Sequence, residues 1–158
     1  MSVISIELAM RHLQAEPDDL PLIQAELDGS ERAAMDYLQR RFFADQAALD
    51  SAKANIGARL SDSRLVFDQA KASAGLTDDH GDRCRLLEYA RRSYSEALED
   101  IDRDAFGIVI NPAITAACLL KLGHLFANRE EVVVGVTAVE LPLASQYLLT
   151  PYRIRMGV

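Results

Sequence analysis

The 158-residue chain has no tryptophan, 2 cysteines, 8 glycines, 5 prolines and only 6% aromatic residues. Two cysteines are too few for a disulfide framework, and neither Cys84 nor Cys118 lies in a CxxC spacing, so we expect free thiols in a reducing compartment. The low glycine and proline content argues against a turn-rich β protein. Alanine (23) and leucine (21) dominate instead, which is the composition of helices.

Positive charge is also scarce, because 17 basic side chains face 24 acidic ones and the net charge is −7. A general nucleic-acid binder needs a basic face, so this class is disfavoured. The most apolar stretch, residues 113–127, contains Lys121 and His124 and is too short to span a membrane. Residues 1–16 lack the basic start and apolar run of a signal peptide, so we expect none.

Hydrophobic spacing predicts an all-α fold, a helical bundle with a long projecting antiparallel helical hairpin and one short extended segment. Ser5 is the expected N-cap of a first short helix, and a second helix is expected over residues 20–43. Asn111 and Pro112 mark the start of a helix over 112–128, since asparagine caps helices and proline suits their first turn. Because that helix is apolar nearly all round, we expect it to be central, with Leu120 and Leu125 buried.

The middle of the chain, residues 46–104, reads as a helical hairpin inserted into a single domain that covers residues 1–158. An unbroken helix is expected over 46–74, with Gly75 as the left-handed residue that ends it, followed by a turn and a returning helix. The contact stripe is rich in alanine, which allows close approach but buries little area, so we expect it to need a neighbour. The single extended segment is expected in the β-branched run 132–139.

Motifs that carry chemistry are missing: the sequence has no GxGxxG, Walker loop, HExxH or GxSxG. His80 and Cys84, with the aspartates around them, have metal-ligand atoms, but no second ligand cluster accompanies them and we expect a solvated turn. His124, His12 and Cys118 are isolated, and we interpret them as packing or surface residues. We therefore expect no catalysis, no cofactor and no metal.

Asn128, Arg129 and Glu130 directly follow the most apolar helix, and two interpretations stay open for them. The three residues form either a simple helix end with a favourable arginine, or a polar group that fixes the exit angle of the chain or pairs across a subunit boundary. Pro151 is expected to end a last short helix and to free a tail that carries Tyr152, Arg153 and Arg155.

Several segments in a fixed order resemble the tailed-phage head–tail connector family, also called head-completion or adaptor proteins. The C-terminal match consists of 123–130, 132–135, 140–142 and 148–153, with Phe126 where the family usually has tyrosine. The N-terminal match consists of 6–13, 18–19, 22–23 and 33–40. The resemblance covers about residues 5–44 and 107–154, and nothing functional carries over to the hairpin between them.

The resemblance implies a structural virion protein, present in the host cytoplasm during assembly and then at the head–tail junction. Such proteins form a ring, often a dodecamer, beneath the portal protein; they extend the DNA channel and receive a tail-completion protein. DNA passes without specific binding, which fits an acidic chain, and no membrane is involved. The expected subunit or portal interface consists of Asn128, Arg129, Glu130, Leu141, Pro142, Tyr152, Arg153 and Arg155.

Two other classes stay open on the sequence. One is a free-standing helical interaction module that dimerises through the hairpin as a coiled coil. The other is a small metal-dependent enzyme that uses His80, Cys84 and the nearby aspartates.

Overall fold

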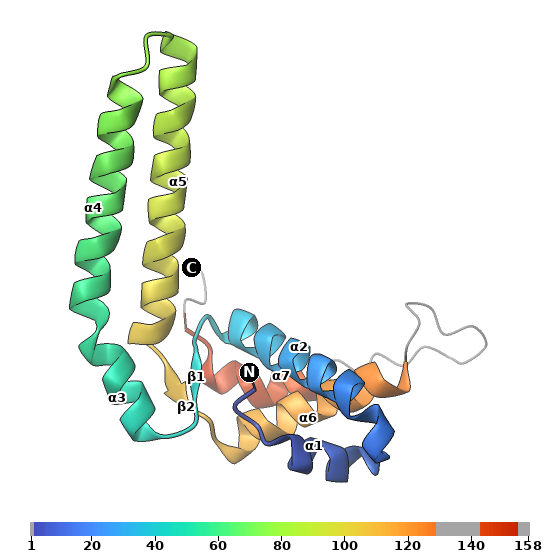
Figure 1. Ribbon diagram of the computed structural model, residues 1–158. Coiled ribbons are helices and arrows are strands. Elements are labelled where there is room, and N and C mark those ends of the chain that lie inside the picture. Colours follow the sequence, from blue (N-terminus) through green and yellow to red (C-terminus); the bar gives the residue numbers. More distant parts are fainter. Residues whose placement is uncertain (1, 129–142, 155–158) are drawn as a thin grey trace. The chain divides into compact units, whose positions relative to one another are not determined.

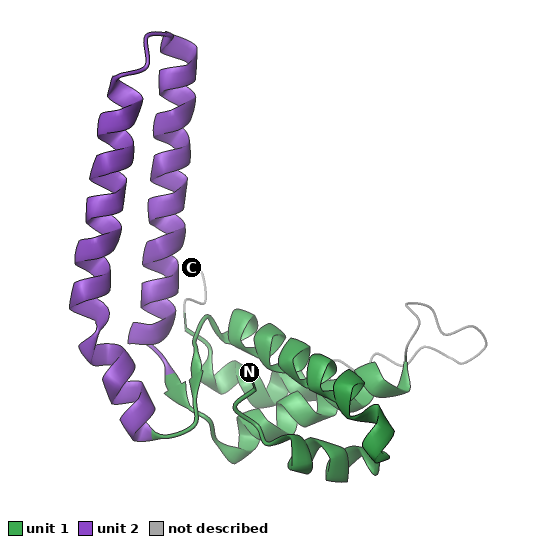
Figure 2. Cartoon of the chain, in the orientation of Figure 1, with its two compact units in different colours: residues 1–45, 108–158 green, residues 46–107 purple. Residues whose placement is uncertain are grey.

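The computed structural model describes residues 2–128 and 143–154, and this part of the chain is mainly helical (Figure 1). The chain divides into two compact units, one of residues 1–45 and 108–158 and one of residues 46–107 (Figure 2). The helical fold class and the antiparallel hairpin are confirmed. The extended segment expected over 132–139 lies outside the described residues.

The first unit contains helices from both ends of the chain. They are α1 (Ile6–Leu13), a 3-10 turn η1 (Pro17–Asp19), α2 (Leu20–Leu38), α6 (Pro112–Ala127), α7 (Leu143–Leu149) and a 3-10 turn η2 (Thr150–Tyr152). Both expected N-caps are confirmed. The Ser5 side-chain oxygen accepts the Leu8 amide proton at 3.2 Å, and the Asn111 side-chain oxygen accepts the Ile114 amide proton at 3.0 Å.

Helix α2 ends at Leu38, five residues before the expected end at Phe43. Gln39 adopts a left-handed conformation with φ 58°, and its side-chain amide donates to the Asp36 carbonyl, so the helix is closed by glutamine rather than glycine. Three residues after Gln39 the chain forms strand β1 (Phe42–Phe43), which pairs in parallel with β2 (Ile108–Val109). Aromatic and β-branched residues favour strands, which explains why this pair wins over a longer helix.

The core of the first unit forms where α2 and α6 cross, and α1 and α7 pack on α6. Its largest fully buried aliphatic side chains are Ile23, Leu27, Leu38, Ile114 and Leu122. The expectation that α6 is the central element agrees with these contacts. The expectation for Leu120 is wrong, since 46% of it is exposed, and Leu125 is only partly buried.

The error on α6 has a simple geometric cause. Successive residues of a helix turn by about 100°, so Leu120 points away from the side that Cys118 and Leu122 present to the core. An apolar sequence on every face shows that a helix can be buried, but it does not show which face is covered.

The second unit contains α3 (Gln46–Ala54), α4 (Ile56–Gly75) and α5 (His80–Ala105), with α4 and α5 side by side along their length (Figure 1). The expected unbroken helix over 46–74 is interrupted at Asn55. The Asn55 side-chain amide donates to the Ser51 carbonyl at 3.0 Å, an example of asparagine competing with the helix for backbone groups. Gly75 is the last residue of α4 and does not adopt a left-handed conformation, and the residue that caps the helix is Leu76, with φ −83°.

Aromatic and charged side chains join α4 to α5 in addition to the small apolar ones. The rings of Phe67 and Tyr94 stack with centroids 4.9 Å apart. Nearer the base, the Arg59 guanidinium binds Asp100 at 2.9 Å and also pairs with Asp104, whose side chain is almost fully buried.

No helix among the described residues is long and apolar enough to cross a membrane.

Candidate interaction surface

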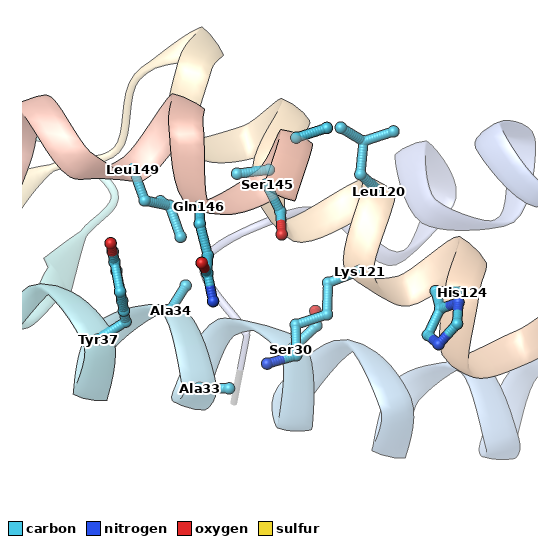
Figure 3. Close-up of a pocket in the computed structure, with 12 residues that line it drawn as sticks. Ser30, Ala33, Ala34, Tyr37, Leu120, Lys121, His124, Ser145, Gln146 and Leu149 are labelled. Atoms are coloured by element: carbon cyan, nitrogen blue, oxygen red, sulfur yellow. The ribbon is translucent and has the colours of Figure 1, made fainter. Parts of the chain in front are cut away.

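A pocket of about 330 Å³ opens between α2, α6 and α7 in the first unit (Figure 3). Its walls are mostly apolar. The space exists because small side chains line the three helices where they face one another. The residues that line it include Ala33 and Ala34 of α2, Ala117 of α6 and Ala144 of α7. Sequence reasoning missed the pocket, although these alanines at helix contacts are a signal that could have indicated it.

Polar groups stand at the mouth and end of this pocket. Figure 3 shows the Lys121 and Gln146 side chains directed from α6 and α7 toward α2. Lys121 is exposed, so its ammonium group is hydrated and able to meet an incoming carboxylate. Ser30 is fully buried beneath them and donates its hydroxyl to the Leu27 carbonyl at 2.9 Å, so that hydroxyl proton is already used. The pocket therefore suits an aliphatic group that carries a negative charge beside it.

Next to the pocket, α2 also anchors the segment that leads into α1. The Glu31 carboxylate accepts the amide protons of Val3 and Ile4 at 2.9 and 2.8 Å. Burial raises the pKa of this carboxyl above its ordinary value of 4.5, and the two hydrogen bonds partly oppose that shift. Sequence reasoning missed this contact, since a glutamate in a helix is most often a surface residue.

Cys118 lies close enough to Glu31 to feel its charge, and it is fully buried. Burial first, and the Glu31 carboxylate second, raise the pKa of the Cys118 thiol to about 12. The neutral thiol is therefore the form present at physiological pH, and a neutral thiol is a poor nucleophile. This agrees with the interpretation of Cys118 as a packing residue.

The residues expected at an interface fall into three groups. Asn128 ends α6, where its side-chain amide donates to the His124 carbonyl at 2.9 Å, so its observed contacts are those of a local cap. Tyr152 and Arg153 lie in the second group, the tail that follows α7. The remaining expected residues, which are Arg129, Glu130, Leu141, Pro142 and Arg155, lie outside the described residues.

The tail is bound to α2 as far as Ile154, rather than freed by Pro151 as expected. The Ile154 amide donates to the Leu38 carbonyl at 3.3 Å, and the Arg153 guanidinium lies 4.9 Å from the Tyr37 ring centroid. The Tyr37 and Thr150 hydroxyls form a hydrogen bond of 3.1 Å. Arg153 nevertheless remains exposed, so the tail presents a positive charge at this end of the first unit.

The turn of the hairpin and the first residues of α5 contain the residues that could bind a metal ion, His80, Cys84 and the nearby aspartates. His80 and Cys84 lie one helical turn apart on α5, with Nε2 and Sγ separated by 3.8 Å. Within residues 2–128 and 143–154, no group of three or more potential ligands is positioned to hold a metal ion. Asp79 instead caps α5 by accepting the Asp82 amide proton at 2.8 Å.

Comparisons of the chain with protein-family models, with curated proteins and with solved structures found no match.

Proposed function

We propose that this chain is a structural subunit of a phage head–tail connector, a ring that joins the portal protein of the head to the tail. The proposal begins from the resemblance of residues 5–44 and 107–154 to that family. Its partners are further copies of itself, the portal protein and a tail-completion protein. DNA crosses the ring without specific binding, and the net charge of −7 disfavours adhesion of phosphate to its wall.

One observation gives the proposal most of its support. The two segments that carry the resemblance are separated by some sixty residues, yet they form a single compact unit in which α1 and α2 pack on α6. The intervening residues 46–107 form a separate unit, which lies in the sequence between strand β1 and strand β2. This arrangement is expected of a single domain that carries an insertion, because the segments before and after the insertion then pack together.

The sharpest test adds the purified chain to portal rings of the phage that encodes it and images the rings by electron microscopy. A connector adds a second ring layer at one end of each portal. A matched variant with Ile23→Asp, which places a charge in the core, should leave the portals bare. Portal rings unchanged by the intact chain would contradict the proposal, and a discrete dimer in solution would then favour the interaction module.

A tail-deleted chain that lacks residues 153–158 examines the expected portal contact in the same assay. If the tail docks into the portal, the deleted chain keeps its helical content but adds no layer. The Tyr37→Phe variant is the control, since it keeps the ring beneath Arg153 and removes only the hydroxyl that pairs with Thr150. A layer that forms without the tail places the portal contact elsewhere on the subunit.

A further inference from the structure

The first unit carries two exposed apolar regions of opposite charge. One is the mouth of the pocket between α2, α6 and α7, where exposed Leu120 lies beside Lys121, the sole lysine of residues 1–45 and 108–158. The other is the turn between α1 and α2, which we call the acidic corner and define as Asp18, Asp19, Leu20 and Leu22. Leu20 is 45% and Leu22 39% exposed.

Local sequence explains why the acidic corner stands out. Pro17 begins the η1 turn, and Asp18 and Asp19 occupy its other two positions, where their charges suit the positive end of the helix that follows. In the first turn of α2, Ile23 faces the core and is fully buried, while Leu20 and Leu22 point outward. A single exposed leucine is ordinary. Here two exposed leucines complement the apolar walls of the pocket, and the two carboxylates beside them complement its ammonium group.

One chain cannot place its own acidic corner in its own pocket. Both lie along α2, with Leu20 at its first turn and Ala34 in the pocket wall fourteen residues later. At 1.5 Å per residue this separation is about 21 Å along a rigid helix. A contact between the corner and the pocket must therefore join two copies, and it joins different surfaces of the two. Contacts of this heterologous kind generate rings when the rotation closes.

We propose that the acidic corner of one copy inserts into the α2–α6–α7 pocket of the next, with Leu20 or Leu22 against the alanine walls and Asp18 or Asp19 paired with Lys121. The occupant of the pocket is thus a second copy of this chain. That the contact closes into a ring rests on the proposed function. The inference adds which surfaces of neighbouring copies form that contact.

Carbodiimide cross-linking tests this pairing directly, because the reagent joins a lysine to a carboxylate only where the two are in contact. The chain has three lysines, and Lys53 of α3 and Lys71 of α4 both lie in the second unit, so they serve as internal controls. Equal amounts of ¹⁴N- and ¹⁵N-labelled full-length chain are mixed, concentrated and cross-linked, and the joined peptides are identified by mass spectrometry. We expect Lys121 joined to Asp18 or Asp19 in mixed-isotope pairs. Their absence, or their presence only within one isotope, overturns the inference.

Charge reversal provides a second, independent measurement on the intact chain. We expect Lys121→Glu alone, and Asp18→Lys with Asp19→Lys, each to weaken self-association by about tenfold, because an attractive pair becomes a repulsive one. Combining the three changes should restore association. Lys71→Glu is the control with the same change of charge on an exposed hairpin lysine, and it should have no effect. Equal loss in the control and the pocket variant, or no rescue in the combination, overturns the pairing.

The outcomes separate this inference from the proposed function. Cross-linked and charge-rescued copies that add no layer to portal rings support the contact and contradict the connector. A portal layer that forms while Lys121 joins no second copy supports the connector and overturns the contact. If Lys121→Glu abolishes only the binding to portal rings, the pocket holds a portal segment, and the proposed occupant is wrong.

Discussion

The two units of the chain differ in how many hydrophobic side chains they bury. The first unit surrounds α6 with a large cluster of buried residues, most of them large aliphatic ones, whereas the second unit buries few. The buried hydrophobic residues of the second unit are Leu49, Ala74, Ala90 and Ile101. Because the free energy gained by burial scales with the apolar area removed from water, hydrophobic burial stabilises the second unit less than the first. The comparison teaches that the first unit has a complete core and the hairpin has only one packed stripe.

The outer faces of the hairpin reflect the same difference. Leu65 and Val66 of α4 are 56% and 61% exposed, and Tyr89 of α5 is exposed as well. Two helices packed without a third layer leave such residues at the surface. Arg59 with its two aspartates, and the stacked Phe67 and Tyr94, then hold the helices in register where aliphatic packing is thin.

The largest expected effect comes from the core of the first unit. Leu122 is fully buried, so Leu122→Ala should lower the free energy of unfolding by about 2–5 kcal/mol. Leu120→Ala, the matched change two residues earlier on the same helix, should lower it by less than about 1 kcal/mol because that side chain is half exposed. Urea denaturation followed by circular dichroism measures both. Equal losses at the two positions would contradict the assignment of the buried face.

A smaller effect is expected where the hairpin depends on charge. Arg59→Met removes the guanidinium that pairs with the buried Asp104 carboxylate, which we expect to cost about 1–3 kcal/mol. Thermal unfolding of this variant measures the loss. The double variant with Asp104→Leu is the control, since it removes the buried charge too and should recover part of the stability. A loss that the second change leaves untouched would show that the pair is not what holds the base of the hairpin.

A variant of Glu31 shows whether a buried polar contact stabilises the first unit as much as the Arg59–Asp104 pair stabilises the second. Glu31→Gln replaces one acceptor oxygen with an amide that faces a backbone N–H, which we expect to cost about 1–2 kcal/mol near neutral pH. Hydrogen exchange at Val3 and Ile4 should also become faster. Unchanged exchange at these two amides would contradict the proposed anchor.

The pH dependence of that variant has a defined sign. The folded-state pKa of Glu31 lies above its unfolded value, so folded chains bind more protons between the two values. The contribution of Glu31 to stability is therefore full below pH 4.5 and falls as the pH rises through the raised pKa. Glu31→Gln should lack this component. A difference between the two proteins that grows in the opposite direction would contradict the assignment of burial as the main cause.

The smallest effect is expected on the outer face of α5. Arg92 and Glu96 form an exposed pair one turn apart at 3.0 Å. Glu96→Ala should cost no more than about 0.5 kcal/mol and should cost less in high salt. Denaturation curves in low and high salt measure this. A loss as large as that of Arg59→Met would erase the distinction between the surface and the base of the hairpin.

Sequence alone predicted the helices whose ends are marked by strong local signals. Ser5 and Asn111 were found because a capping side chain acts on the residues next to it. The break at Asn55 and the end of α2 at Gln39 were not found, since both depend on competition between local hydrogen bonds and packing elsewhere. The exposed position of Leu120 and the pocket beside it were not found, because they depend on which helices cover α6.

The most direct test of the connector is the position of the chain in complete phage particles. A short peptide tag inserted in the exposed turn at Leu76 can be labelled with an antibody fragment and imaged on particles by electron microscopy. We expect a ring of label at the head–tail junction, beneath the portal, on every complete particle. Complete, tailed and infectious particles that carry no label and do not contain the chain would contradict it.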